Sequence, residues 1–139
     1  MSARTKARKR ALDVLFEAEQ RGVEPRTVYL RIATDASSPL NPYTEELVDG
    51  VVAHQDRIDE LIATYAEGWS LDRMPAVDRN LLRIAVFELL FATDVPTNVA
   101  IDEAVSLAGD LSTDESPSFI NGLLGRIAQM QQRATDVTE

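Results

Sequence analysis

The stretch from Val77 to Ala92 constrains the fold more than any other part of this 139-residue chain. After Arg83 it holds a single polar residue, Glu88, so it leaves no wide face for water. Such a segment is typical of a helix that other helices surround. It is too short and too charged to span a bilayer. Pro75 suits the start of this helix and Pro96 prevents its continuation, so the sequence predicts a buried central helix.

Apolar residues recur at helical spacing through the rest of the chain, and no alternating strand pattern competes with them. The pattern predicts an all-α fold of about seven helices, arranged as two small helical bundles around the central buried helix. Residues 67–70 (Glu-Gly-Trp-Ser) break the helical pattern. We therefore expect an N-terminal lobe with a basic arm at 1–67 and a C-terminal lobe at 68–139, together forming one domain.

Composition excludes several kinds of chemistry. The chain has no cysteine, which excludes disulfides, thiolate metal sites and cysteine nucleophiles. Its one histidine, His54, lies on the apolar stripe of the predicted third helix, where structural packing competes with a role as a catalytic base. One histidine and no cysteine do not provide a zinc site, and no phosphate-binding glycine motif is present. We expect no metal and no cofactor. The N-terminus has no apolar signal-peptide segment, so we expect a cytoplasmic protein.

Charge is distributed unevenly along the chain. The net charge is −9, yet the first ten residues hold five bases and no acid; the remaining residues hold nine bases and 23 acids, a net −14. We call these five bases the basic arm: Arg4, Lys6, Arg8, Lys9 and Arg10. An acidic body with a basic end indicates an anionic ligand at that end.

Five bases at the start of a helix are unfavourable for the stability of that helix. Cations at a helix N-terminus face the positive end of the helix dipole, and each costs about 0.3–1 kcal/mol when exposed. Arg4 and Arg8 are also like charges at four-residue spacing, as are Lys6 and Arg10. Folding stability therefore does not explain the arm, whereas the phosphates of a nucleic acid would reverse both penalties.

Other interpretations of the arm stay open at this point. It could be a solvated tail, a contact for an acidic protein in a helical scaffold that binds no RNA, or a membrane-surface contact. The last is disfavoured because acids rather than an apolar face follow the bases. Base-specific recognition of single-stranded RNA also uses exposed aromatic side chains. The candidates are Phe119, at the edge of its helix stripe, and Trp69; for both, a place in the core is the competing interpretation.

Several stretches, in this order, resemble the NusB family of transcription antitermination factors. They are Arg8–Phe16 (RKRALDVLF), Val77–Leu90 (VDRNLLRIAVFELL), Asp94–Pro96 (DVP), Val99–Ala108 (VAIDEAVSLA) and Ser116–Leu124 (SPSFINGLL). The resemblance covers nearly the whole chain, and its C-terminal half is the more specific part. The chain has Asp102 where the family usually has asparagine. RNA methyltransferases with a NusB-like domain carry a further cofactor-binding domain, and this sequence stops at Glu139, so the resemblance does not imply that activity.

The resemblance implies two helical bundles, no enzyme activity, and binding of boxA-type single-stranded RNA from ribosomal RNA operons through the first helix. Arg4, Lys6, Arg8 and Arg10 fall at or beside the family's basic positions, and Lys9 joins them by charge alone. It also implies a partner, the small-subunit ribosomal protein NusE, within an RNA polymerase antitermination complex. The acidic body suits a basic partner, and we place that contact at Asp114 and Glu115. Whether the chain is a monomer or a homodimer stays open.

Overall fold

The computed structural model describes residues 2–35, 37 and 39–138, with side chains described through Met130. Within these residues the chain is all α-helical, as predicted, but six α-helices and one 3-10 turn replace the expected seven helices. The elements are α1 (Ala3–Arg21), α2 (Pro25–Ala33), α3 (Pro42–Tyr65), the 3-10 turn η1 (Leu71–Arg73), α4 (Ala76–Phe91), α5 (Thr97–Leu111) and α6 (Ser116–Thr138).

Local sequence signals account for the ends of the first three helices. α1 begins at Ala3 because the Ser2 hydroxyl accepts a hydrogen bond from the backbone N–H of Thr5 at 3.0 Å. It ends at Gly22, which has the left-handed φ of 67° that glycine adopts without strain. The Asn41 side chain caps α3 by accepting from the N–H of Tyr43 at 2.9 Å.

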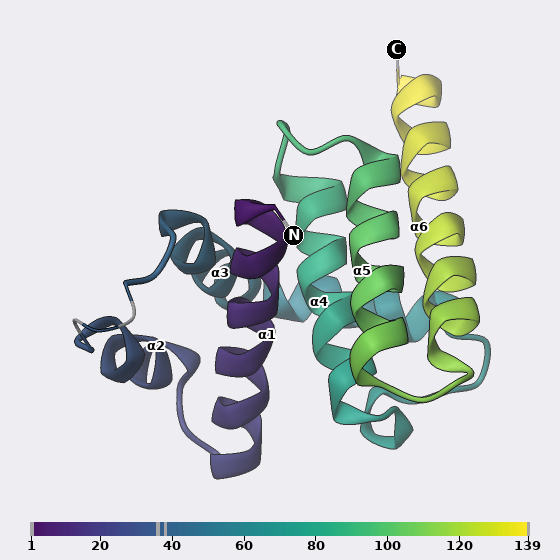
Figure 1. Ribbon diagram of the computed structural model, residues 1–139. Helices are drawn as coiled ribbons and strands as arrows, with labels where there is room; N and C mark the ends of the chain where they lie inside the picture. Colours follow the sequence, from purple (N-terminus) through teal and green to yellow (C-terminus); the bar gives the residue numbers. More distant parts are fainter. Residues whose placement is uncertain (1, 36, 38, 139) are drawn as a thin grey trace.

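α4 is the central helix that the sequence predicts. Residues 80–88 are all buried, and α4 contacts α1, α3, α5 and α6. Figure 1 shows α1 and α2 on one side of α4 and α5 and α6 on the other, with α3 passing behind α4 to contact α6. One continuous hydrophobic core joins both groups. Among the described residues, no helix has the length and apolar character needed to cross a membrane.

α3 departs from regular helical geometry at His54, where φ is −116° and ψ is 15°. The imidazole is half-buried and stacks on the ring of Phe91, with centroids 3.8 Å apart and planes 9° apart. This packing favours the structural interpretation of His54 over a catalytic base. Among the described residues, no group of three acidic or histidine side chains is placed to hold a metal ion.

The close approach of α3 and α4 depends on Gly50. A Cβ at this position would overlap the ring of Phe87, a side chain that is almost fully buried. Gly50→Ala is therefore expected to destabilise the protein by about 1–3 kcal/mol, despite alanine's better helix propensity. Urea unfolding measures the change.

Gly125→Ala is the matched control, because Gly125 is exposed in α6 and its Cβ would meet nothing within 4 Å. That substitution is expected to stabilise by about 0.5–1 kcal/mol. Equal effects at the two glycines would contradict the packing argument.

Candidate nucleic-acid interface

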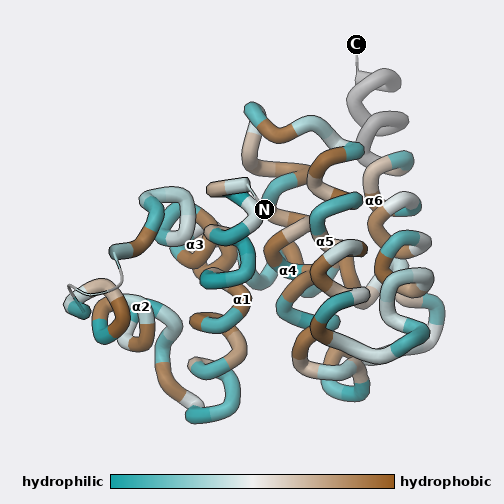
Figure 2. Tube along the Cα trace, viewed as in Figure 1, coloured by the Kyte–Doolittle hydropathy of each residue, from teal (hydrophilic) through white to brown (hydrophobic). Residues whose placement is uncertain are grey.

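The basic arm occupies the first turns of α1, where Figure 2 shows hydrophilic residues near the N-terminus. The five bases differ in their exposure and in their contacts. Lys6 and Lys9, the only lysines in the chain, are exposed and form no salt bridge with a described residue, although the charge of Lys9 acts on the Asp13 carboxylate. Arg4 is also exposed, but its guanidinium donates to Asp94 at 2.8 Å and lies 4.2 Å from the centroid of the Tyr43 ring.

Arg8 differs from the other bases. The prediction that folding stability does not explain the basic arm is wrong for this residue. Its side chain is 4% exposed, and its Nε and Nη2 each donate to the Glu88 carboxylate at 2.9 Å. A third nitrogen, Nη1, lies 3.1 Å from Glu103. Arg8 is thus a buried ion-pair partner inside the fold, and its assignment to RNA binding stays a prediction for a side chain that is almost fully buried.

The carboxylate of Glu88 also accepts a short hydrogen bond from the Tyr43 hydroxyl. Burial and this hydrogen bond raise the pKa of the Tyr43 phenol. Burial alone would lower the pKa of Arg8, but the hydrogen bonds and charge of Glu88 outweigh it, so the pKa is raised and Arg8 stays charged. The cluster therefore fixes the start of α1 against α3, α4 and α5.

Arg10 is intermediate in exposure between the exposed Arg4 and the buried Arg8. It is half-buried and interacts electrostatically with Asp13 and Asp35. The exposed cationic surface therefore consists of Arg4, Lys6 and Lys9, with Arg10 partly accessible.

A groove forms at the other end of α4 and brings together two aromatic residues that the sequence singles out. Trp69 is 55% exposed, Phe119 is half-buried, and their ring centroids are 6.3 Å apart at an interplanar angle of 56°. We call this the aromatic groove; its volume is about 520 Å³ and its lining is Trp69, Arg73, Met74, Pro75, Asp78, Thr113, Glu115, Ser116 and Phe119. Phe119 packs partly against the core, so Trp69 is the more accessible of the two rings.

The two acidic residues expected to bind a partner lie at this end as well. Asp114 and Glu115 are both exposed in the turn before α6, and only Glu115 lines the aromatic groove. Asp78 was not predicted as part of the site. It is buried and accepts hydrogen bonds from the hydroxyls of Ser112 at 2.6 Å and Ser116 at 2.8 Å, which fixes that turn. The sequence signal for this role of Asp78 is an acidic residue in the first turn of the central helix.

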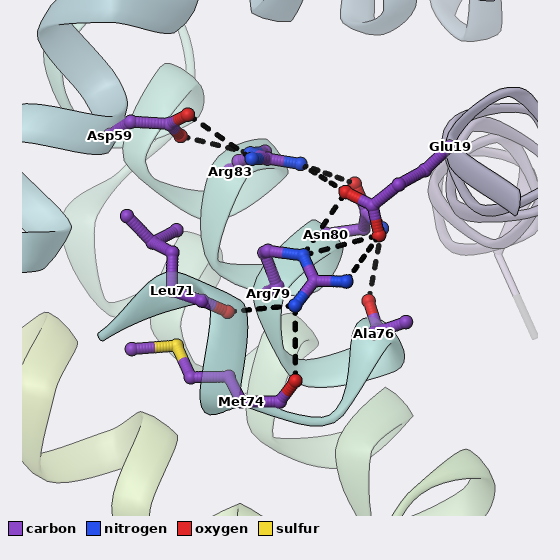
Figure 3. Close-up of polar contacts among 8 residues, drawn as sticks. All are labelled: Glu19, Asp59, Leu71, Met74, Ala76, Arg79, Asn80 and Arg83. Carbon is purple, nitrogen blue, oxygen red and sulfur yellow. Dashed lines mark hydrogen bonds and ion pairs between the residues drawn. The ribbon is translucent and has the colours of Figure 1, made fainter. Parts of the chain in front are cut away.

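An ion-pair network ties α1 and α3 to α4 near the groove (Figure 3). Glu19 accepts hydrogen bonds from both Arg79 and Arg83, and Arg83 also donates to Asp59 at 2.9 Å. Burial would raise the pKa of Glu19, but hydrogen bonds from the two arginines outweigh it and the pKa is lowered. The two arginines therefore keep the Glu19 carboxylate ionised at neutral pH.

Comparison with known proteins agrees with this architecture. The model of the NusB family matches residues 5–129. The transcription antitermination protein NusB of a Nocardioides species is 59% identical over 93% of this chain and 96% of its own. The structure of T. maritima NusB superposes with a TM-score of 0.80 at 35% identity, covering 93% of this chain and 92% of that one.

A further solved structure contains the antitermination factors NusB and NusE in complex with double-stranded RNA. The matching chain has a TM-score of 0.82 and 28% identity, covering 94% of this chain and 98% of that chain. A family model that matches most of the sequence, together with a relative at 59% identity, establishes the relationship. The chain belongs to the NusB family of transcription antitermination proteins.

Proposed function

We propose that this protein is a non-enzymatic RNA-binding factor that promotes antitermination in ribosomal RNA operons. In this proposal it binds boxA-type single-stranded RNA together with NusE, in a cytoplasmic RNA polymerase complex. The observation that carries the proposal is the exposed cationic surface at the start of α1. Lys6 and Lys9 stay exposed there, without an ion pair to a described residue, on a chain whose net charge is −9.

The helix N-terminus adds to this surface. The first N–H groups of a helix lack intrahelical acceptors and carry partial positive charge, which favours a phosphate. Arg4 is held by an exposed ion pair with Asp94 that is worth little, so a phosphate of the RNA replaces that carboxylate at small cost. These contacts position a strand and do not read its sequence.

The aromatic groove supplies a second surface that suits bases. Trp69 and Phe119 offer ring faces for stacking, and Arg73 adds an exposed cation at the edge. The groove lies at the first turn of α4, whereas Asp94, which holds Arg4, follows the last turn. α4 has 16 residues, so an RNA that contacts both surfaces extends over roughly 24 Å.

The partner contact is proposed at Asp114 and Glu115, beside the groove. Two exposed carboxylates on an acidic body are complementary to a basic ribosomal protein and would speed its association. A related structure contains NusB, NusE and double-stranded RNA, which supports a joint complex of protein partner and RNA. Its RNA is a duplex, so single-stranded and duplex boxA RNA are both needed in the test.

Titration of boxA RNA at several salt concentrations tests the proposal. If Arg4, Lys6, Lys9 and Arg10 all contact phosphate, the log–log salt slope should approach about −2.8 for a single strand. Lys6→Ala with Lys9→Ala should reduce the slope to about −1.4, because two of four contacts are lost. Fluorescence anisotropy of labelled RNA, with and without NusE, measures both values.

Arg57→Ala is the control, because Arg57 is an exposed base on α3 that pairs with Glu60 outside the arm. It should leave the slope unchanged. Binding that is indifferent to Lys6 and Lys9 would favour the alternative, a helical scaffold that contacts only proteins. Scrambled and duplex RNA show whether selectivity needs the sequence, the single strand or NusE.

A further inference from the structure

One wall of the aromatic groove is a short irregular segment, and two of its backbone carbonyls accept hydrogen bonds from one side chain of α4. Trp69, Met74 and Pro75 line the groove on this wall, which follows α3 and contains the 3-10 turn Leu71–Arg73. The segment has little regular structure: Glu67 and Gly68 have positive φ angles, and η1 is only three residues long, closed by local backbone hydrogen bonds from Arg73 to Ser70 and from Met74 to Leu71.

Arg79 on α4 adds hydrogen bonds to this segment from outside it (Figure 3). Its Nη1 donates to the backbone carbonyls of Leu71 at 2.7 Å and Met74 at 3.0 Å. Its Nε donates to the carboxylate of Glu19 at 3.0 Å, and Nη2 makes a further short hydrogen bond to the same group. The planar guanidinium thus joins the turn to α1, and its side chain is 13% exposed.

We propose that Arg79 is a positioning residue that holds Trp69 in place and thereby gives the aromatic groove its affinity for RNA bases. This inference rests on the proposed function of the groove. All Arg79 donors named above are used within the protein, so Arg79 acts through the turn and not by touching RNA. The opposite wall has its own support, since Asp78, the preceding residue, holds Ser112 and Ser116. Neighbouring residues of the first turn of α4 therefore fix the two walls.

Lysine cannot replace arginine in this role. An ammonium group is a compact charge without the fork that reaches two carbonyls and a carboxylate together. Arg79→Lys keeps the charge opposite Glu19 but releases the turn. Arg83→Lys is the matched control, because Arg83 belongs to the same network through Glu19 and Asp59 and donates to neither Leu71 nor Met74.

Trp69 is the only tryptophan in the chain, so its fluorescence reports this wall alone. In the full-length protein, Arg79→Lys should raise acrylamide quenching of Trp69 and lower its anisotropy. It should also weaken boxA RNA binding about fivefold or more, the lower end of what one base–aromatic stack contributes. The salt slope should stay unchanged, because no phosphate contact is lost. Arg83→Lys should lower thermal stability and leave quenching and RNA affinity within about twofold of the unsubstituted protein.

Unchanged quenching in Arg79→Lys, or equal losses of RNA affinity in Arg79→Lys and Arg83→Lys, would overturn the inference. Raised quenching with unchanged RNA affinity in Arg79→Lys would also overturn the inference. The turn would then be held by Arg79 without contributing to RNA binding. Failure of the proposed function looks different: the unsubstituted protein itself would bind no boxA RNA, with or without NusE.

Discussion

Arg8→Ala is expected to destabilise the protein by about 3–5 kcal/mol, the cost of leaving a buried carboxylate without its partner. Arg8 and Glu88 have side chains 4% and 1% exposed, and the bond between them is bidentate. Because a folded domain is stable by about 5–15 kcal/mol, this loss is a large fraction of the total. Thermal unfolding should show a Tm lower by about 10–20 °C.

Two comparisons separate burial from charge. Lys6→Ala removes an exposed base of the same arm and should change stability by less than about 0.5 kcal/mol. Arg8→Leu combined with Glu88→Leu removes both buried charges and should recover part of the loss, although the Tyr43 hydroxyl then lacks its acceptor. If Arg8→Ala unfolded like Lys6→Ala while RNA binding fell, Arg8 would be a surface base after all.

Arg8 also shows where sequence reasoning reached its limit. Arg8 precedes Ala11, Leu12 and Leu15 by three, four and seven residues, so the helical period already placed it on the buried face. Glu88, the one acid of α4 after Arg83, is a further sequence signal of a buried cation. The helical period does not predict that Arg8 pairs with Glu88. The two residues are 80 positions apart and meet only when α1 packs on α4.

The fold itself followed more directly from the sequence. Gly22 ends α1, Pro25 and Pro42 begin α2 and α3, and Asn41 caps α3, all through local backbone geometry that single residues signal. The candidate groove did not follow in this way. Trp69 and Phe119 are 50 residues apart, and their meeting depends on the turn that Arg79 holds, which has no periodic pattern to read.

Trp69→Ala is expected to weaken boxA RNA binding by about 1–3 kcal/mol, or about 5–150-fold, if a base stacks on this ring. Trp69 is more than half exposed, so the substitution should change folding stability little. It also removes no charge, so the affinity should fall at every salt concentration while the slope stays the same. Anisotropy of labelled RNA measures both.

Loss of Lys6 and Lys9 should give the opposite result, a flatter slope, so the two surfaces have distinguishable effects on binding. Trp69→Phe keeps a ring face and should retain most of the affinity, whereas Leu30→Ala, at an exposed apolar residue of α2, should have no effect. Phe119→Ala should act in the same direction as Trp69→Ala, but part of its effect will be on stability because the ring is half-buried. Full affinity in Trp69→Ala would leave the start of α1 as the RNA contact and would assign sequence selectivity to NusE.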